Sequence, residues 1–184
     1  MKLLSTPLPG VLVIEPRVFA DGRGFFVETF RTDLLSEAGL AEPFVQDNHS
    51  RSRKGVLRGL HYQLEQPQGK LVRVTRGAVY DVAVDVRLDS PSFGQWFGCV
   101  LDDETHRQLY VPPGFAHGFC VLSDEVDFVY KCTDYYHPQS EQGIAWDDPD
   151  LAIKWPLQDV SLSEKDQGHP GLADQAPERL PKYG

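Results

Sequence analysis

Residues 46–63 read Q-D-N-H-S-R-S-R-K-G-V-L-R-G-L-H-Y-Q, a stretch that is densely polar and yet ends in a strand-like run. From Arg51 to Arg76 the chain carries seven Lys and Arg residues against one acid, Glu65, although the whole chain has a net charge of -9. Polar side chains on a half-buried strand are costly to bury unless they are paired. The stretch therefore predicts a local cationic pocket for a small anionic ligand, such as a phosphate held by Arg side chains. The alternative from the residues alone is a set of solvated Arg side chains on the outside of the strands.

The composition is ordinary for a soluble globular protein. The chain has 184 residues, of which 41% are hydrophobic and 24% charged, and one domain is the usual outcome at this length. We expect a single domain over 1–184, with a core at about 11–155 and a C-terminal tail at 156–184. The acidic net charge and the lack of a long basic tract argue against nucleic acid as a partner. No apolar run approaches membrane-spanning length, so we expect no membrane partner.

The cysteines and the N-terminus indicate a cytoplasmic protein. Cys99, Cys120 and Cys132 lie in apolar runs without the short spacing of a metal site. An odd number of cysteines without a framework is typical of reduced core thiols inside the cell. The first ten residues, M-K-L-L-S-T-P-L-P-G, are interrupted by prolines too early to form the apolar region of a signal peptide.

Short strands separated by turn residues run through most of the chain. D-G-R-G at 21–24 predicts a hairpin turn, because its two glycines supply the backbone angles that a hairpin needs. One helix is expected at 33–38, with Thr32 as its cap and Gly39 as its end. The expected strands are 11–15, 25–30, 44–48, 56–63, 70–76, 78–87, 95–101, 107–111, 117–122 and 125–133. This pattern predicts an all-β fold, a barrel or jelly roll, with a short N-terminal helix and an extended C-terminal tail.

The clearest alternation lies at 78–87. Positions 80, 82, 84 and 86 are aromatic or apolar and share one face, while Asp81 and Asp85 lie on the other. Two carboxylates that face the inside of a barrel would line a site, whereas carboxylates that face water would be unremarkable surface charges.

Two short motifs resemble those of the cupin barrel. Gly55-x5-His61-x-Gln63, followed by Gly77, resembles the first motif, and Pro112-x-Gly114-x2-His117 resembles the second. Only His61 and His117 match ligand positions of the metal-binding cupins, because Gln63 is a poor ligand and Lys70 enters the neighbourhood. Two histidines beside a cation do not make a good transition-metal site. The resemblance therefore implies a cupin-type jelly-roll β-barrel that works without metal and without a cofactor.

A longer series of motifs resembles a narrower family, the dTDP-4-dehydrorhamnose 3,5-epimerases. The match is collinear from Pro16 to Asp166, and its strength lies in the number of motifs rather than in any one of them. The motifs are D-x-R-G-F-F (21–26) with Glu28, Q-D-N-H-S (46–50), G-V-L-R-G-L-H-Y-Q (55–63), Q-G-K-L-V-R (68–73), D-V-A-V-D-V-R (81–87), P-P-G-F-A-H-G-F (112–119), Y-K-C-T-D-Y-Y (130–136), W-D-D-P-D-L (146–151) and S-E-K-D (163–166).

The resemblance implies a reaction and its catalytic groups. The family's substrate is a dTDP-linked 4-keto-6-deoxyhexose, whose protons on C3 and C5 are acidified by the C4 ketone. Their removal needs a base near neutral pKa, a cation at the developing oxyanion and a proton donor on the opposite face. His61 suits the base, with Asp166 fixing its tautomer, Lys70 suits the enolate, and Tyr130 suits the acid. His117 and Asp81 are expected to form a second, orienting pair near the sugar.

Without the resemblance, each catalytic candidate has a structural interpretation. A strand histidine such as His61 is more often a satisfied structural group than a base. Tyr130 alone would be a core aromatic with its hydroxyl bonded, Asp166 a surface charge, and Lys70 a side chain that extends to water at a strand end.

The substrate-binding residues are also carried over from the family. Arg58 is the best candidate for the diphosphate, with help from Gln46, Asn48 and Ser50. In the family the D-x-R-G-F-F region of one subunit reaches into the neighbouring site, which implies a homodimer with shared active sites. The residues that this assigns to nucleotide recognition are Phe19, Arg23, Phe26 and Glu28, with Tyr136 stacking near the base.

Two rival functions stay open. Some relatives invert only C3 or only C5, or shift the keto group, on similar scaffolds for antibiotic deoxysugars, and the residues named above are compatible with those reactions. A rival from another class is a non-catalytic cupin that binds a sugar nucleotide. It is disfavoured because binding alone needs no base opposite an acid.

The geometry of residues 56–63 makes a further prediction. Side chains alternate along a regular strand, so Arg58 and His61 should fall on opposite faces, yet the site needs both. Gly59 lies between them, and glycine readily takes the backbone angles of a bulge. We therefore expect a bulge at Gly59–Leu60 that brings Arg58 and His61 into one pocket.

Overall fold

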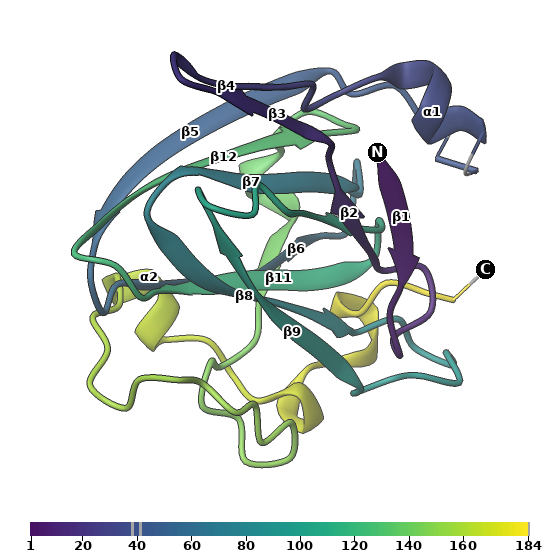
Figure 1. The fold of residues 1–184 in the computed structure, drawn as a ribbon. Helices are drawn as coiled ribbons and strands as arrows, with labels where there is room; N and C mark the ends of the chain where they lie inside the picture. The colour runs from purple at the N-terminus through teal and green to yellow at the C-terminus, as the bar shows by residue number, and fades with distance from the viewer. Residues whose placement is uncertain (38, 41, 184) are drawn as a thin grey trace.

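The computed structural model describes residues 1–37, 39–40 and 42–183, and nearly all regular structure in this part of the chain is β (Figure 1). One sheet contains six strands in the order β1 (Lys2–Ser5), β2 (Leu12–Glu15), β10 (Gln108–Val111), β7 (Lys70–Arg76), β12 (Glu125–Cys132) and β5 (Gln46–Arg53). The other contains five, in the order β13 (Glu141–Gly143), β6 (Leu57–Gln63), β11 (Phe115–Val121), β8 (Ala78–Asp85) and β9 (Trp96–Asp102). The prediction of an all-β fold is confirmed, with two main sheets and a separate two-stranded hairpin.

The remaining elements are short. β3 (Val18–Asp21) and β4 (Gly24–Val27) form the predicted hairpin, in which Asp21 pairs with Gly24. The predicted N-terminal helix is α1 (Thr32–Glu37); Ala38, at its expected end, lies outside the described residues. The chain ends with α2 (Glu164–Gln167) and the 3-10 turns η2 (Leu172–Asp174) and η3 (Pro177–Arg179), after η1 (Pro138–Ser140). Among the helices that the structure describes, none has the length and apolar character needed to cross a bilayer.

The predicted strand ends differ most from the observed ones at β5. This strand runs to Arg53, five residues beyond the predicted end at Asn48, and its side chains alternate between half-buried or buried and exposed. Its outward residues are Asp47, His49, Arg51 and Arg53, whose charges make it look like a loop in the sequence. The short strands β1, β3 and β13 were not predicted, since three or four residues do not establish an alternation.

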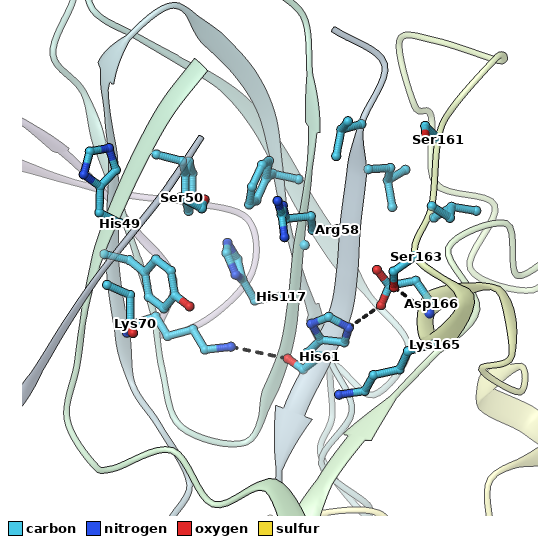
Figure 2. Close-up of a pocket in the computed structure, with 18 residues that line it drawn as sticks. His49, Ser50, Arg58, His61, Lys70, His117, Ser161, Ser163, Lys165 and Asp166 are labelled. Atoms are coloured by element: carbon cyan, nitrogen blue, oxygen red, sulfur yellow. Dashed lines mark hydrogen bonds and ion pairs between the residues drawn. The ribbon is translucent and has the colours of Figure 1, made fainter. Parts of the chain in front are cut away.

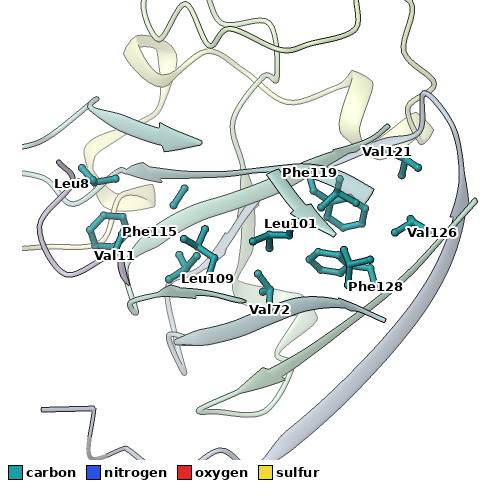
Figure 3. Close-up of a cluster of buried hydrophobic side chains, with 14 residues drawn as sticks. Leu8, Val11, Val72, Leu101, Leu109, Phe115, Phe119, Val121, Val126 and Phe128 are labelled. Carbon is teal, nitrogen blue, oxygen red and sulfur yellow. The ribbon is translucent and has the colours of Figure 1, made fainter. Parts of the chain in front are cut away.

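The main core lies between the two sheets (Figure 3). Phe128 from β12 stacks on Phe119 from β11, with ring centroids 4.1 Å apart, so the aromatic contact joins one sheet to the other. The core is completed by aliphatic side chains of both inner faces, including Val72, Val126, Leu101, Leu109 and Val121. This packing closes one part of the space between the sheets and leaves the other for a cavity.

The C-terminal chain covers the outer face of the five-stranded sheet (Figure 1). Trp155 and Leu151 pack with strand residues such as Leu60 and Val84, and the Trp155 indole donates a 2.8 Å hydrogen bond to the Trp146 carbonyl. Leu172 and Leu180 of the expected tail are buried in the same layer. On the other sheet, Leu35 of α1 packs on Ile14, Leu71 and Tyr110. The C-terminal chain therefore covers the outer face of the five-stranded sheet, and α1 covers part of the outer face of the six-stranded sheet.

Candidate active site

A cavity of about 500 Å³ opens between the two sheets, within the usual size range of small-molecule sites. One wall comes from the six-stranded sheet and the other from the five-stranded sheet, and the start of α2 closes one side (Figure 2). The lining includes Asn48 and Ser50 of β5, Lys70 of β7, Tyr130 of β12, Arg58 and His61 of β6, His117 of β11, and Ser163, Lys165 and Asp166 of the tail.

A bulge in β6 brings Arg58 and His61 into the same cavity. His61 pairs with His117 and Arg58 with Phe119, so three steps along β6 oppose two steps along β11. Gly59 has a φ of +114°, and its peptide bond to Leu60 is cis. A Cβ on Gly59 would lie 2.5 Å from the Cα of Gly118. The predicted bulge at Gly59–Leu60 is confirmed.

His61 forms a short contact with a carboxylate from the tail. Its Nε2 lies 2.5 Å from Oδ1 of Asp166, which α2 holds in place because its backbone N–H donates to the capping Ser163 hydroxyl at 3.1 Å. Burial disfavours ionisation of Asp166, but contacts with His169 and His61 outweigh it and lower the pKa of the carboxyl. An ionised carboxylate only accepts hydrogen bonds, so Nε2 of His61 carries a proton, and in the neutral form of the ring the lone pair is on Nδ1.

Lys70 and Tyr130 lie on the opposite sheet. The Lys70 amine is 3.5 Å from the His61 carbonyl oxygen (Figure 2), and burial lowers the pKa of Lys70 against the opposing influence of Cys132, Glu141 and Asp81. Burial raises the pKa of Tyr130, so its phenol is protonated at neutral pH. The cavity therefore has an imidazole on one wall and the amine and phenol of two half-buried side chains on the other.

His117 and Asp81 form a buried pair beside His61. Nε2 of His117 lies 2.9 Å and 3.1 Å from the two oxygens of Asp81, and both side chains are almost inaccessible. Burial raises the pKa of Asp81, although His117 and Lys70 oppose this. Asp85, the other carboxylate of the alternating strand, is also buried but bonds to Arg87, Ser90 and Ser92 away from the cavity.

Arg58 and polar residues of β5 line the same cavity. The Arg58 guanidinium donates to the Ser52 hydroxyl at 3.0 and 3.1 Å. Asn48 and Ser50 line the cavity, whereas Gln46 does not. The Gln46 side-chain amide nitrogen donates to Oδ1 of Asn48 at 3.1 Å, and its side-chain oxygen accepts from the backbone N–H of Tyr136.

Tyr136 is 52% exposed at the edge of this region. Its hydroxyl donates to Glu141 at 2.6 Å, and this bond, followed by burial, raises the pKa of Tyr136 to about 12.

The cationic run contributes only part of its charge to the cavity, so the prediction of a cationic pocket is confirmed in part. Alternation on β5 and β7 turns Arg51 and Arg73 to the outer faces, and Arg51 there makes two 2.8 Å hydrogen bonds with Asp127. Of the cations at 51–76, Arg58 and Lys70 line the cavity, and Lys165 joins them from the tail.

The four residues expected from the hairpin region are not brought to this cavity. Phe19 is 49% and Phe26 68% exposed, Arg23 pairs with Asp21, and Glu28 lies 3.9 Å from Arg31. None of the four lines the cavity of its own chain. The hairpin lies at the top of Figure 1, and its Phe25 ring is 4.5 Å from that of His106, measured between centroids.

Three residues near His61 were not found from the sequence. Glu141 of β13 lies 3.9 Å from Nδ1 of His61 and is bonded by Lys165, while His169 lies 3.6 Å from Asp166. Lys165 directly precedes Asp166 in the sequence, and this adjacency to a candidate catalytic residue was the one signal that could have indicated it. Glu141 and His169 follow no periodic pattern, because short irregular segments position them.

One cluster could also hold a cation. Ligand atoms of His61, Asp166 and His169 all lie within 4.8 Å of one another. Gln63, at the cupin ligand position, is used otherwise: its amide donates to the carbonyls of Gln66 and Tyr135, and its oxygen accepts from the backbone of His137. The expected absence of metal stays a prediction.

Comparison with known proteins identifies the family. The model of the dTDP-4-dehydrorhamnose 3,5-epimerase family matches residues 5–174. The chain belongs to this family. A dTDP-4-dehydrorhamnose 3,5-epimerase from Pseudomonas aeruginosa is 56% identical over 176 residues, which cover 95% of this chain and 97% of the relative.

Solved structures of family members have the same fold. A dTDP-6-deoxy-D-glucose-3,5-epimerase from Legionella pneumophila, in complex with dTDP-4-keto-L-rhamnose, has a TM-score of 0.97 and 54% identity over 100% of this chain and 98% of its own. A 3'-monoepimerase from Streptomyces bikiniensis, in complex with dTDP-quinovose, has a TM-score of 0.89 and 38% identity over 97% of this chain and 93% of its own. Proteins similar to this chain therefore include a 3'-monoepimerase as well as 3,5-epimerases.

Proposed function

We propose that the chain is an isomerase that epimerises C3 and C5 of dTDP-4-dehydro-6-deoxy-D-glucose to give dTDP-4-dehydro-L-rhamnose, as in deoxysugar biosynthesis. The observation that carries the proposal is the pair of opposed cavity walls: the His61–Asp166 pair lies on one, and Lys70 and Tyr130 lie on the other. Inversion at carbon needs a base and an acid on opposite faces of the sugar.

The base in this mechanism is Nδ1 of His61. Because Nε2 donates to Asp166, the imidazolium that forms when a proton leaves C3 or C5 is stabilised by an adjacent carboxylate. The electrons released from the C–H bond move into the C4 ketone, and Lys70 supports the resulting enolate oxygen. Tyr130, which is protonated at neutral pH, then supplies a proton from the other face. His117, fixed by Asp81, orients the sugar.

The rest of the substrate occupies the part of the cavity that Arg58, Asn48 and Ser50 line. Arg58 binds the diphosphate, supported by Asn48 and Ser50 directly and by Gln46 through Asn48. Tyr136 is free on one side to stack near the base.

The chain acts as a homodimer in which the hairpin of each subunit completes the site of the other. This accounts for exposed aromatic side chains far from the cavity of their own chain, namely Phe19, Phe25 and Phe26, and assigns Arg23 and Glu28 to the same nucleotide site.

The fold and location follow from the same assignment. The two facing sheets correspond to a flattened cupin-type jelly roll, and 1–184 forms one domain whose tail at 156–184 supplies Asp166. The free cysteines, Cys99, Cys120 and Cys132, suit the cytoplasm. Neither nucleic acid nor membrane is a partner in this proposal, and no cofactor takes part.

Solvent-isotope incorporation tests the function. The chain is incubated with dTDP-4-keto-6-deoxyglucose in deuterated water, and the sugar is read by NMR. Deuterium at both C3 and C5 supports the 3,5-epimerase. Deuterium at one carbon favours the second candidate, a single-site epimerase, which the similarity to the Streptomyces bikiniensis 3'-monoepimerase supports. Deuterium at neither carbon, with binding retained, would favour a non-catalytic sugar-nucleotide protein.

A further inference from the structure

Asp166 is shared by two histidines. Its Oδ1 lies 2.5 Å from Nε2 of His61 and 3.6 Å from Nε2 of His169, and the two imidazole rings are nearly perpendicular with centroids 5.5 Å apart. His169 does not line the cavity, so it does not contact the substrate directly. The polar group through which it can act on the reaction is the Asp166 carboxylate.

The position of His169 is built into the fold. Its ring lies against Gly143, which pairs with His61 across β13 and β6, and a Cβ at Gly143 would overlap Nε2, Cε1 and Cδ2 of His169. The segment after His169 is fixed, because the Pro170 carbonyl accepts a 2.8 Å hydrogen bond from Ala145. Gly143 therefore leaves a slot beside His61 that the imidazole of His169 fills.

The His169 ring has an unused hydrogen-bonding atom at this point. Its Nε2 is buried and has no partner in the part of the chain that the structure describes. The nearest acceptor is the Asp166 carboxylate, only a few tenths of an ångström beyond hydrogen-bond distance. Hydrogen bonds of catalytic groups are often long in a ligand-free site and tighten when the substrate binds.

We propose that His169 is a positioning residue that donates its Nε2 hydrogen to Oδ1 of Asp166, holding the carboxylate ionised and aligned so that His61 presents Nδ1 to the sugar. This inference rests on the proposed epimerase function. A carboxylate that accepts hydrogen bonds from two N–H donors stabilises a charge on each of them less. His169 therefore also reduces the stabilisation that Asp166 gives to the protonated His61.

Other charged groups act on the same pair and must be kept constant in any test. The groups that face His61 and Asp166 from neighbouring elements are Glu141 of β13, Lys165 of α2, Lys70 of β7, His117 of β11 and Arg58 of β6. The variants below change none of them.

Two substitutions at His169 separate hydrogen bonding from packing. His169→Phe keeps a flat ring in the slot and removes the donor, whereas His169→Gln keeps an N–H near the position of Nε2. Gly143→Ala leaves residue 169 a histidine, but the added methyl group displaces the His169 ring. Gln167→Ala, an exposed change in α2, is the matched control.

The expected results concern kcat and pH rather than KM. His169→Phe lowers kcat about ten-fold, as for the loss of one hydrogen bond to a charged group, with KM unchanged. The acidic limb of its pH–rate profile moves to higher pH by about one unit or less, because Asp166 then acts on His61 alone. Gly143→Ala behaves like His169→Phe, His169→Gln restores most of kcat, and Gln167→Ala matches the wild type.

The proposal is overturned if His169→Phe has wild-type kinetics, or if His169→Phe and His169→Gln lose activity equally with an unshifted acidic limb. The nitrogen NMR spectrum of the wild-type imidazoles gives a test that needs no variant. A neutral His169 protonated at Nε2 agrees with the proposal, and one protonated at Nδ1 contradicts it. If the wild type exchanges no solvent hydrogen into the sugar, the proposed function fails, but this spectrum still decides the His169–Asp166 bond.

Discussion

Gly59 and Gly118 lie against each other on β6 and β11, and neither has room for a side chain. A Cβ on Gly118 would lie 2.6 Å from the Arg58 carbonyl oxygen, and one on Gly59 would lie 2.7 Å from that of His117. This contact permits the bulge between Arg58 and His61. The proposed diphosphate-binding and base residues share a cavity because two backbones approach without side chains.

Gly59→Ala should therefore destabilise the protein and displace His61. We expect a loss of about 2–4 kcal/mol in the free energy of unfolding, from the positive φ together with overpacking against backbone, and a large fall in activity. Urea unfolding and isotope exchange measure the two effects. Gly22→Ala, whose Cβ would meet nothing within 4 Å, is the stability control. A Gly59→Ala protein as stable as the wild type would show that the bulge tolerates a side chain.

His61→Asn should abolish solvent exchange at both C3 and C5, because one base serves both steps. Tyr130→Phe should keep proton removal but lose productive protonation at C5, so deuterium incorporation should persist while inversion fails. NMR of the sugar in deuterated water separates the two outcomes. Near-wild-type exchange at either carbon in His61→Asn would exclude a single base.

Activity should survive exhaustive chelation, with no stoichiometric metal in the purified protein. The reason is that Asp166 already accepts the Nε2 hydrogen of His61, while the Lys70 amine, a cation, lies 3.5 Å from the backbone carbonyl oxygen of the same residue. Elemental analysis and turnover after dialysis against a chelator check this. One tightly bound transition metal per chain, lost together with turnover, would instead point to the group His61, Asp166 and His169.

Mixed dimers should reveal shared active sites. Chains with His61→Asn and chains with Arg23→Ala and Phe26→Ala should each be nearly inactive as homodimers. In a mixed dimer one site combines an intact His61 with an intact hairpin, so an equal mixture should recover about a quarter of the wild-type rate. Mixtures that stay inactive, although mass spectrometry shows that mixed dimers form, would place the hairpin outside the partner's site.

Asp85→Asn should destabilise the fold in a pH-dependent way. Burial alone would raise the pKa of Asp85, but hydrogen bonds from Arg87, Ser90 and Ser92 lower it below its unfolded value. The stabilisation is thus fully present above about pH 4 and is lost as the pH falls through the folded pKa. We expect a difference of about 2–4 kcal/mol from the wild type at pH 7 that shrinks below pH 4. Urea unfolding across this range measures it, with the exposed Asp47→Asn as control, and a difference that grows at acid pH would contradict the assignment.

Much of the fold could be predicted from the sequence because strand periodicity is a local property. Lys70–Arg76 was predicted to the residue, and the alternation at 125–133 placed Phe128, Tyr130 and Cys132 on one face, where they are buried or half-buried. The bulge could be predicted for a similarly local reason: Gly59 lies between Arg58 and His61, which the site needs on the same face. Collinear motifs named the family, and with it the candidates His61, Lys70, Tyr130 and Asp166.

Tertiary structure alone decided which groups meet at His61. Asp166 is 105 residues further along the chain, and Glu141 and His169 arrive on a three-residue strand and an irregular segment that carry no periodic signal. Charge counting over 51–76 predicted a cationic pocket and was right only in part, since Arg58 and Lys70 line the cavity whereas alternation sends Arg51 and Arg73 outward. The sequence determines the faces of each strand, whereas the pairing of distant segments, and so the hydrogen bonds at the base, depends on how the whole chain packs.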